Sequence, residues 1–120
     1  MGVREKSIYD PPAPDDGHRV LTTNYWPRGI SRERAGTYLR ALAPTRGLLR
    51  AFKDGEIDWP AYRERYLAEM QGDEQRRLIG ELAAEARRGV VTVMCVCRET
   101  EQCHRFLLRT LIEQAMAEAA

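Results

Sequence analysis

Three cysteines, a histidine and an arginine lie within eleven residues near the carboxyl end of the chain, at positions Cys95, Cys97, Cys103, His104 and Arg105. They supply nucleophilic thiols, a group that exchanges protons near neutral pH, and a fixed positive charge. This composition predicts the chemical centre of the protein. We expect His104 to act there as general acid or base and Cys97 as the nucleophile.

The elements around this segment should hold it at the end of a strand. Residues 90–97 form an apolar run that predicts a buried strand ending at Cys97. A helix is predicted from Thr100, because apolar residues then repeat with helical period at Leu107, Leu108, Leu111, Ile112 and Ala115. In its first turn His104 should face the sheet near Cys97, and Arg105 should lie on a more exposed side. A helix start favours an anion and a neutral histidine.

Two other kinds of site fit the segment less well. Cys95, Cys97, Cys103 and His104 are suitable zinc ligands, but the paired Cys-x₂-Cys spacing is absent. Neighbours on a helix such as Cys103 and His104 should also diverge by about 100°. In phosphatase-like loops an arginine follows the cysteine by six residues, whereas Cys103 stands there after Cys97. We therefore expect no bound metal and no cofactor.

A second segment could share the same edge of the sheet. The run Trp26-Pro27-Arg28-Gly29 follows a predicted strand over 18–25 and precedes a helix that Ser31 caps, predicted to continue to about Ala43. If the two strands are parallel, both loops lie at the same sheet edge, where α/β proteins bind ligands. The predicted crevice holds a small anionic or nucleotide-like ligand, with the ligand-binding residues Trp26, Arg28, Cys103 and Arg105. A core position for Trp26 remains an alternative.

The remaining elements complete an α/β pattern. A short strand is predicted over 6–9, followed by a proline-rich loop over 10–17. Helices are predicted over 45–52, after Asp58 and after Asp73, with an apolar stripe at Trp59, Tyr62, Tyr66 and Met70 on the second. The sequence thus predicts a single α/β domain over residues 1–120, with a small, mainly parallel central sheet flanked by helices.

Composition limits the classes of partner. The 120 residues carry a formal net charge of +1, which gives no overall field for nucleic acid or an anionic membrane. No apolar run approaches the roughly 20 residues of a membrane span, and the first residues lack a signal-peptide core. We therefore expect a cytoplasmic protein with reduced thiols and no membrane partner. The oligomeric state is left open.

One alternative belongs to a different functional class. Arginines are densest in the middle of the chain, at Arg32, Arg34, Arg40, Arg46 and Arg50. If they share a continuous surface, they could contact phosphates in a non-catalytic nucleic-acid or protein-interaction module. A solvated helical face is the simpler interpretation, so a nucleic-acid partner is not favoured.

Several motifs in order resemble a known family. They are Ile8-Tyr9-Asp10-Pro11-Pro12, residues 16–21, Trp26-Pro27-Arg28-Gly29-Ile30-Ser31, Leu42-Ala43-Pro44-Thr45 with residues 48–50, the aromatic residues Trp59, Tyr62 and Tyr66, and Cys103-His104-Arg105. Together they resemble the domain of unknown function 488 family, the YeaO-like proteins. The resemblance implies a small intracellular α/β domain and no established activity. Many relatives carry Asp-Arg before the Trp-Pro-Arg-Gly motif, whereas this chain has Thr23-Asn24.

Overall fold

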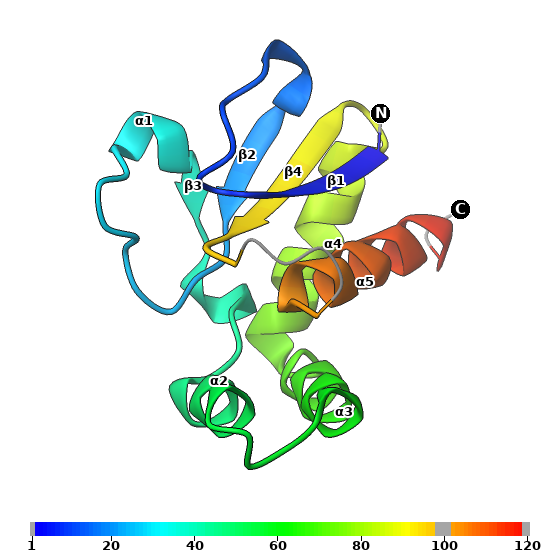
Figure 1. The fold of residues 1–120 in the computed structure, drawn as a ribbon. Helices are drawn as coiled ribbons and strands as arrows, with labels where there is room; N and C mark the ends of the chain where they lie inside the picture. The colour runs from blue at the N-terminus through cyan, green and yellow to red at the C-terminus, as the bar shows by residue number, and fades with distance from the viewer. Residues whose placement is uncertain (1, 98–101, 119–120) are drawn as a thin grey trace.

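A four-stranded parallel sheet forms the centre of the protein. The computed structural model describes residues 2–97 and 102–118 (Figure 1). The strands are β1 (Gly2–Ser7), β2 (His18–Leu21), β3 (Thr37–Tyr38) and β4 (Val90–Cys95), in the spatial order β1-β4-β2-β3. Every pairing is parallel, and Ser7 lies opposite Cys95 at the carboxyl ends of β1 and β4. The predicted α/β class with a small parallel sheet is confirmed.

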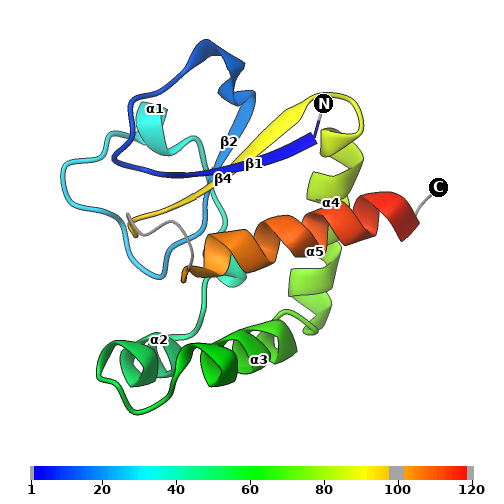
Figure 2. The same ribbon diagram turned by 45° about the vertical axis from the view of Figure 1, so that its right-hand side comes forward.

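The longer helices cover one face of the sheet and its carboxyl edge. Helices α4 (Asp73–Ala86) and α5 (His104–Glu118) pack against each other and against β4. Helices α2 (Arg46–Lys53) and α3 (Trp59–Glu69) lie side by side beyond the carboxyl ends of the strands (Figures 1 and 2). Short pieces complete the chain: α1 (Arg32–Ala35) and the 3₁₀ turns η1 (Pro14–Asp16) and η2 (Arg40–Leu42). In the part of the chain that the structure describes, no helix could cross a membrane.

Side chains alternate along the strands, so the two faces have separate cores. Val20, Val91 and Val93 belong to the larger core, which includes Tyr62, Tyr66, Leu82, Leu108 and Ile112 from the helices. Leu21 and Met94 point to the opposite face, where they pack with Ile8, Ile30 and Ala35. Cys95 has the parity of Val91 and Val93 in β4, so it shares the helix-covered face.

The long helix predicted from Ser31 to about Ala43 is wrong. Ser31 does cap a helix, but α1 ends at Ala35. Gly36 has a φ of 68°, and a Cβ atom there would lie 2.3 Å from the carbonyl oxygen of Arg19. Glycine therefore lets the chain pass close to β2, and Thr37–Tyr38 pairs with β2 as the edge strand β3. A tertiary contact thus overrides the helical pattern.

Other boundaries move by a few residues. The strand predicted over 6–9 is β1 at Gly2–Ser7, and the one predicted over 18–25 ends at Leu21. The strand predicted to end at Cys97 ends at Cys95. Asp58 caps α3 through Ala61 N–H as predicted, whereas Gly72 occupies the N-cap of α4, where Asp73 was expected to be the cap. Thr100, the predicted start of the last helix, lies outside the described residues.

Candidate functional site

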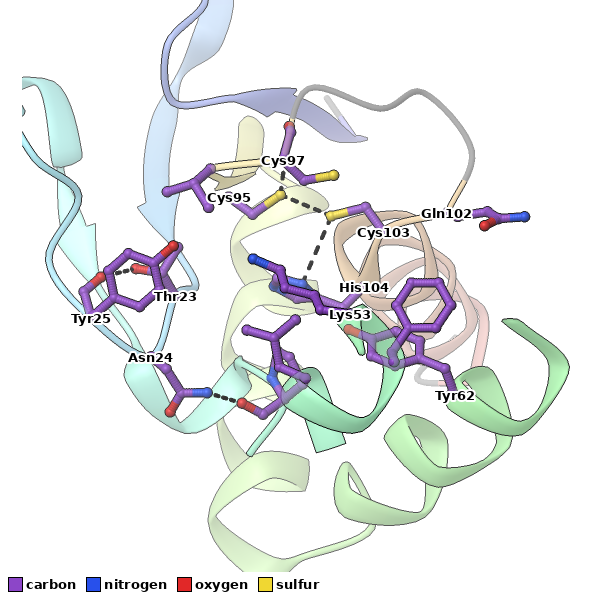
Figure 3. A pocket seen from close by; sticks show the side chains of 14 residues that line it. Thr23, Asn24, Tyr25, Lys53, Tyr62, Cys95, Cys97, Gln102, Cys103 and His104 are labelled. Carbon is purple, nitrogen blue, oxygen red and sulfur yellow. Dashed lines mark hydrogen bonds between the residues drawn. The ribbon is translucent and has the colours of Figure 1, made fainter. Parts of the chain in front are cut away.

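A cavity of about 380 Å³ lies at the carboxyl edge of the sheet (Figure 3). Its walls come from the loop after β2, the end of β4, the start of α5, helix α2 and one residue of α3. Its lining is mainly apolar and aromatic, with a few polar side chains: Thr23, Asn24, Tyr25, Pro44, Leu49, Phe52, Lys53, Tyr62, Cys95, Val96, Cys97, Gln102, Cys103 and His104. This mixture is typical of sites for small molecules.

The topology of the sheet explains why the cavity is here. After β2 the chain continues to β3 on one side, whereas after β4 it enters α5, which packs against β1 on the other side. The segments that follow two neighbouring strands therefore separate. Open α/β sheets bind ligands in the crevice that such a separation leaves beyond the strand ends.

Cys95 is the thiol that the structure surrounds with activating groups. Its Sγ atom lies 2.8 Å from Sγ of Cys103 and accepts a hydrogen bond from Nη1 of Arg105 at 3.3 Å. The hydrogen bond from Cys103 lowers the pKa of Cys95, and the charge of Arg105 lowers it further. The same hydrogen bond and burial raise the pKa of Cys103. Because Arg105 contacts the sulfur of Cys95, the thiolate form is favoured at Cys95 rather than at Cys103.

His104 begins α5 and is a neutral base. Its Nε2 atom lies 2.8 Å from the carbonyl oxygen of Thr22. Because a carbonyl only accepts, Nε2 carries the proton, and the unprotonated Nδ1 faces Sγ of Cys103 at 3.8 Å. Burial lowers the pKa of His104 to about 4, and the nearby charge of Arg105 lowers it as well. The neutral form that the sequence predicted at this helix start is therefore the form present near neutral pH.

Arg105 lies on the buried side of α5, so its predicted exposure is wrong. Only 3% of its surface is accessible, because α5 packs closely against β1 and β4. Its Nε atom forms an ion pair with Glu5 of β1 at 3.0 Å, and Nη1 also donates to the carbonyl oxygen of Cys97. Arg105 does not line the cavity. It contacts Cys95 from the side away from the cavity, where its positive charge and its hydrogen bond favour the thiolate form of the sulfur.

Cys97 differs from Cys95 although both line the cavity. Arg105 reaches Cys97 through its backbone carbonyl, but reaches Cys95 at the sulfur atom. The predicted nucleophile Cys97 therefore lines the cavity, whereas the contacts that stabilise a thiolate converge on the sulfur of Cys95. Side chains alternate along an extended strand, so the sequence predicts Cys95 and Cys97 on the same face. Because β4 ends at Cys95, this pattern does not show which of the two sulfur atoms Arg105 contacts.

Three of these groups also resemble a metal site. Sγ of Cys95, Sγ of Cys103 and one ring nitrogen of His104 lie within 4.8 Å of one another. The predicted divergence of Cys103 and His104 is therefore wrong, because Cys103 precedes the helix that His104 begins. Two thiolates on one tetrahedral zinc ion lie roughly 3.8 Å apart. The sulfur atoms here are 2.8 Å apart, closer than two ligands of one zinc ion.

The Trp26–Gly29 segment does not join this cavity. Neither Trp26 nor Arg28 is among the described residues that line it. Nε1 of Trp26 donates to the carbonyl oxygen of Ile30 at 2.8 Å, and the ring packs edge-on against Tyr38. Because β2 ends at Leu21, residues 23–25 of the following loop form the cavity wall, and Trp26 lies beyond it.

The arginine-rich region is divided among several elements. Arg32 and Arg34 belong to α1, Arg40 to η2, and Arg46 and Arg50 to α2. Arg34 donates to the carbonyl oxygens of Ile8 and Asp10. The five residues therefore belong to three separate elements, α1, η2 and α2.

Comparisons with known proteins agree with the sequence motifs. A family model described as the Active DUF488-N3 subclade matches residues 3–116. The chain belongs to the DUF488 family. It is similar to the Uncharacterized protein YeaO of Escherichia coli strain K12, with 32% identity over 110 residues that cover 90% of this chain and 94% of YeaO. The Uncharacterized proteins Mb3100c of Mycobacterium bovis and Rv3073c of Mycobacterium tuberculosis strain H37Rv are each 29% identical over 112 residues, or 92% of both chains. No solved structure matches significantly.

The structure places the departure from the usual family motif in the cavity wall. Thr23 and Asn24, the pair at which the sequence departs from the Asp-Arg that the family resemblance implies, both line the cavity. Thr23 donates to the carbonyl oxygen of Tyr25 at 2.6 Å, and Asn24 donates to that of Pro44. These two side chains therefore hold the loop after β2 in its path around the cavity.

Proposed function

We propose that this DUF488 protein binds a small anionic or nucleotide-like ligand in the cavity beyond β2 and β4, and that Cys95 reacts with it as a nucleophile. The observation that carries the proposal is the position of Cys95. Its sulfur borders the cavity while it contacts Cys103 and Arg105, two donors that stabilise a thiolate. A cysteine that merely fills the core needs neither contact.

The cavity walls support the ligand class. Tyr25, Phe52 and Tyr62 offer ring surfaces against which a flat group can pack. Lys53 and the amino end of α5 supply positive electrostatic potential for an anionic group. His104 lies at the same end in its neutral form, so it can take a proton during the reaction.

Alkylation kinetics test this proposal directly. Iodoacetamide should label Cys95 faster than Cys97 or Cys103 at pH 7, because the thiolate is the reacting form. Peptide mapping by mass spectrometry after short exposure identifies the labelled residue. Cys95→Ser should abolish the fast reaction, and Cys97→Ser, a matched change of a thiol in the same cavity, should leave it intact.

Ligand protection tests the chemical class. Adenosine monophosphate serves as a probe with both a ring and an anionic group, and adenosine and inorganic phosphate each retain one of these features. Adenosine monophosphate should slow the labelling of Cys95 more than either part does, because it occupies the apolar wall and the positive end together. If none of the three changes the rate at millimolar concentration, the ligand class is wrong.

The proposed reaction also includes a cellular location, the cytoplasm. A thiolate nucleophile needs a compartment that keeps cysteines reduced, and the cytoplasm predicted from the sequence would provide this. The name of the matched family model includes the word "Active", which fits a reaction but names none. The arginines of the nucleic-acid alternative are divided over α1, η2 and α2, and none of them is among the described residues that line the cavity.

A further inference from the structure

We propose that Cys95 and Cys103 form a dithiol centre that peroxide converts to an internal disulfide, with Cys103 as the resolving thiol. This inference rests on the proposed reactivity of Cys95, but not on the identity of the ligand. It assigns the second thiol a chemical role, namely to trap the oxidised form of the first.

The geometry is close to that of the product. The two Sγ atoms are 2.8 Å apart, and a disulfide bond is about 2.05 Å long. An approach of about 0.8 Å between the sulfurs therefore completes the bond. Cys95 ends β4 and Cys103 directly precedes α5, so neither sulfur has to be drawn out of the middle of a helix or a strand.

The groups around the two thiols can assist thiolate formation, proton transfer and the entry of peroxide. Arg105 donates to Sγ of Cys95 and favours the thiolate, which is the form that attacks a peroxide. Nδ1 of His104 carries no proton and faces Sγ of Cys103, so it can receive the proton that Cys103 releases. Both sulfurs line the cavity, through which a small peroxide can arrive although the side chains are buried.

The electrons balance in two steps. The Cys95 thiolate attacks one oxygen of hydrogen peroxide, the O–O bond breaks, and hydroxide leaves and takes up a proton to form water. The resulting sulfenic acid of Cys95 is then attacked by the sulfur of Cys103. The S–O bond breaks, the S–S bond forms, and the departing hydroxide takes up the proton of Cys103, passed on by Nδ1 of His104, as a second water. Two thiols lose two electrons and the peroxide gains them.

The test oxidises the full, reduced chain with one equivalent of hydrogen peroxide. The number of titratable thiols should fall from three to one per chain. The intact mass should fall by about 2 Da, because two hydrogens are lost when the disulfide forms. Peptide mapping should find the Cys95–Cys103 link, and dithiothreitol should restore all three thiols.

Variants separate the roles of the three cysteines. Cys103→Ser should stop the reaction at a Cys95 sulfenic acid, which dimedone traps, and Cys103→Ala provides a second variant if the serine disturbs folding. Cys97→Ser should still form the Cys95–Cys103 disulfide, which shows that Cys97 is not the resolving thiol. Circular dichroism checks that each variant is folded.

Three results would overturn the inference. The first is a wild-type chain that accumulates Cys95 sulfenic or sulfinic acid while Cys103 stays reduced. The second is a disulfide that uses Cys97. The third is release of stoichiometric zinc on oxidation, which would identify a metal–thiolate centre instead. If Cys95 alkylates quickly and no disulfide forms, the dithiol fails and the proposed nucleophile stands; if Cys95 resists alkylation, both fail.

Discussion

Two buried polar clusters lie on opposite faces of the same sheet. They differ in whether their polar atoms border a cavity. On the face away from α4 and α5, Asp16 accepts from Lys6 and Arg19 at 3.1–3.2 Å and from the Ala13 N–H at 2.9 Å. On the other face, Arg105 pairs with Glu5 and holds the sulfur of Cys95 beside a cavity.

The Asp16 cluster stabilises the fold, whereas the Cys95 cluster presents reactive atoms to a cavity. In the Asp16 cluster each charge meets an opposite charge, and the carboxylate also caps the backbone of the loop before β2. In the Cys95 cluster, the sulfur of Cys95 and the neutral His104 are placed where small molecules can arrive. Buried charge alone therefore does not indicate a functional site; reactive atoms in a cavity do.

The largest effect should come from removing the charge of Asp16. Asp16→Asn leaves Lys6 and Arg19 buried without their common counter-charge, and we expect a loss of about 3 kcal/mol in the free energy of unfolding. Urea denaturation followed by circular dichroism measures this loss. The matched control is Asp15→Asn, because the Arg4–Asp15 pair is solvent-exposed and should contribute nothing measurable. Equal stability of the two variants would show that the Asp16 cluster is not structural.

Acid should weaken the other cluster through His104. Its pKa is about 4 in the folded chain and about 6.5 in an unfolded one, so unfolded molecules bind the proton more readily. Stability present above pH 6.5 is lost as the pH falls towards 4, by about 3 kcal/mol in total. Urea midpoints measured across this range report the loss.

The control for this prediction is His104→Gln, which keeps an N–H for the carbonyl of Thr22 but does not titrate. Its pH dependence between 6.5 and 4 should be flatter than that of the wild type. The Ala13 N–H hydrogen bond and the charges of Lys6 and Arg19 lower the pKa of Asp16, so its contribution is lost mainly below this window, starting at about pH 5, and is common to both proteins. A wild type as flat as the variant would contradict the burial of a neutral His104.

A smaller effect should follow from removing the guanidinium that contacts Cys95. In Arg105→Met combined with Glu5→Gln, no buried charge is left unpaired and the pKa of Cys95 rises. Labelling of Cys95 by iodoacetamide at pH 7 should slow about tenfold, as expected for one pKa unit. Glu5→Gln alone is the control and should label at nearly the wild-type rate, because Arg105 still contacts the sulfur.

The smallest effect is expected at the rim of the cavity. Lys53→Ala should weaken binding of adenosine monophosphate about threefold, because Lys53 is exposed and solvent screens its charge. Arg50→Ala removes an equal charge from an exposed position of the same helix that does not line the cavity. Isothermal titration calorimetry on both variants compares them, and equal losses would indicate a diffuse charge effect rather than a site.

Much of the fold can be predicted from local pattern in this chain. Asp58 marks the start of α3, Thr45 the start of α2, and the apolar run from Val90 the central strand β4. The edge strand β3 could not be predicted, because two residues gain their pairing only when Gly36 lets them approach β2. Short edge strands depend on a neighbour rather than on their own sequence.

The candidate site could be predicted only in part. Cys103 and His104 can be predicted because they stand at a helix start after a buried strand, which is a local signal. Phe52, Lys53 and Tyr62 enter the cavity from α2 and α3, distant in sequence and without a motif of their own. Trp26 belongs to a conspicuous motif, so the sequence predicts it as a ligand-binding residue. In the structure its ring packs against Tyr38 instead.

The amino-acid sequence by itself determined that a strand rich in valine delivers thiols to a helix start and that the chain is an α/β protein. Both follow from residue periodicity and helix-start signals, which act over a few neighbours. Only the tertiary structure decided that Arg105 and Cys103 contact the sulfur of Cys95 rather than that of Cys97. That choice depends on Arg105 and Cys103 approaching one sulfur to within 3.3 and 2.8 Å, and such distances exist only after α5 has packed on the sheet.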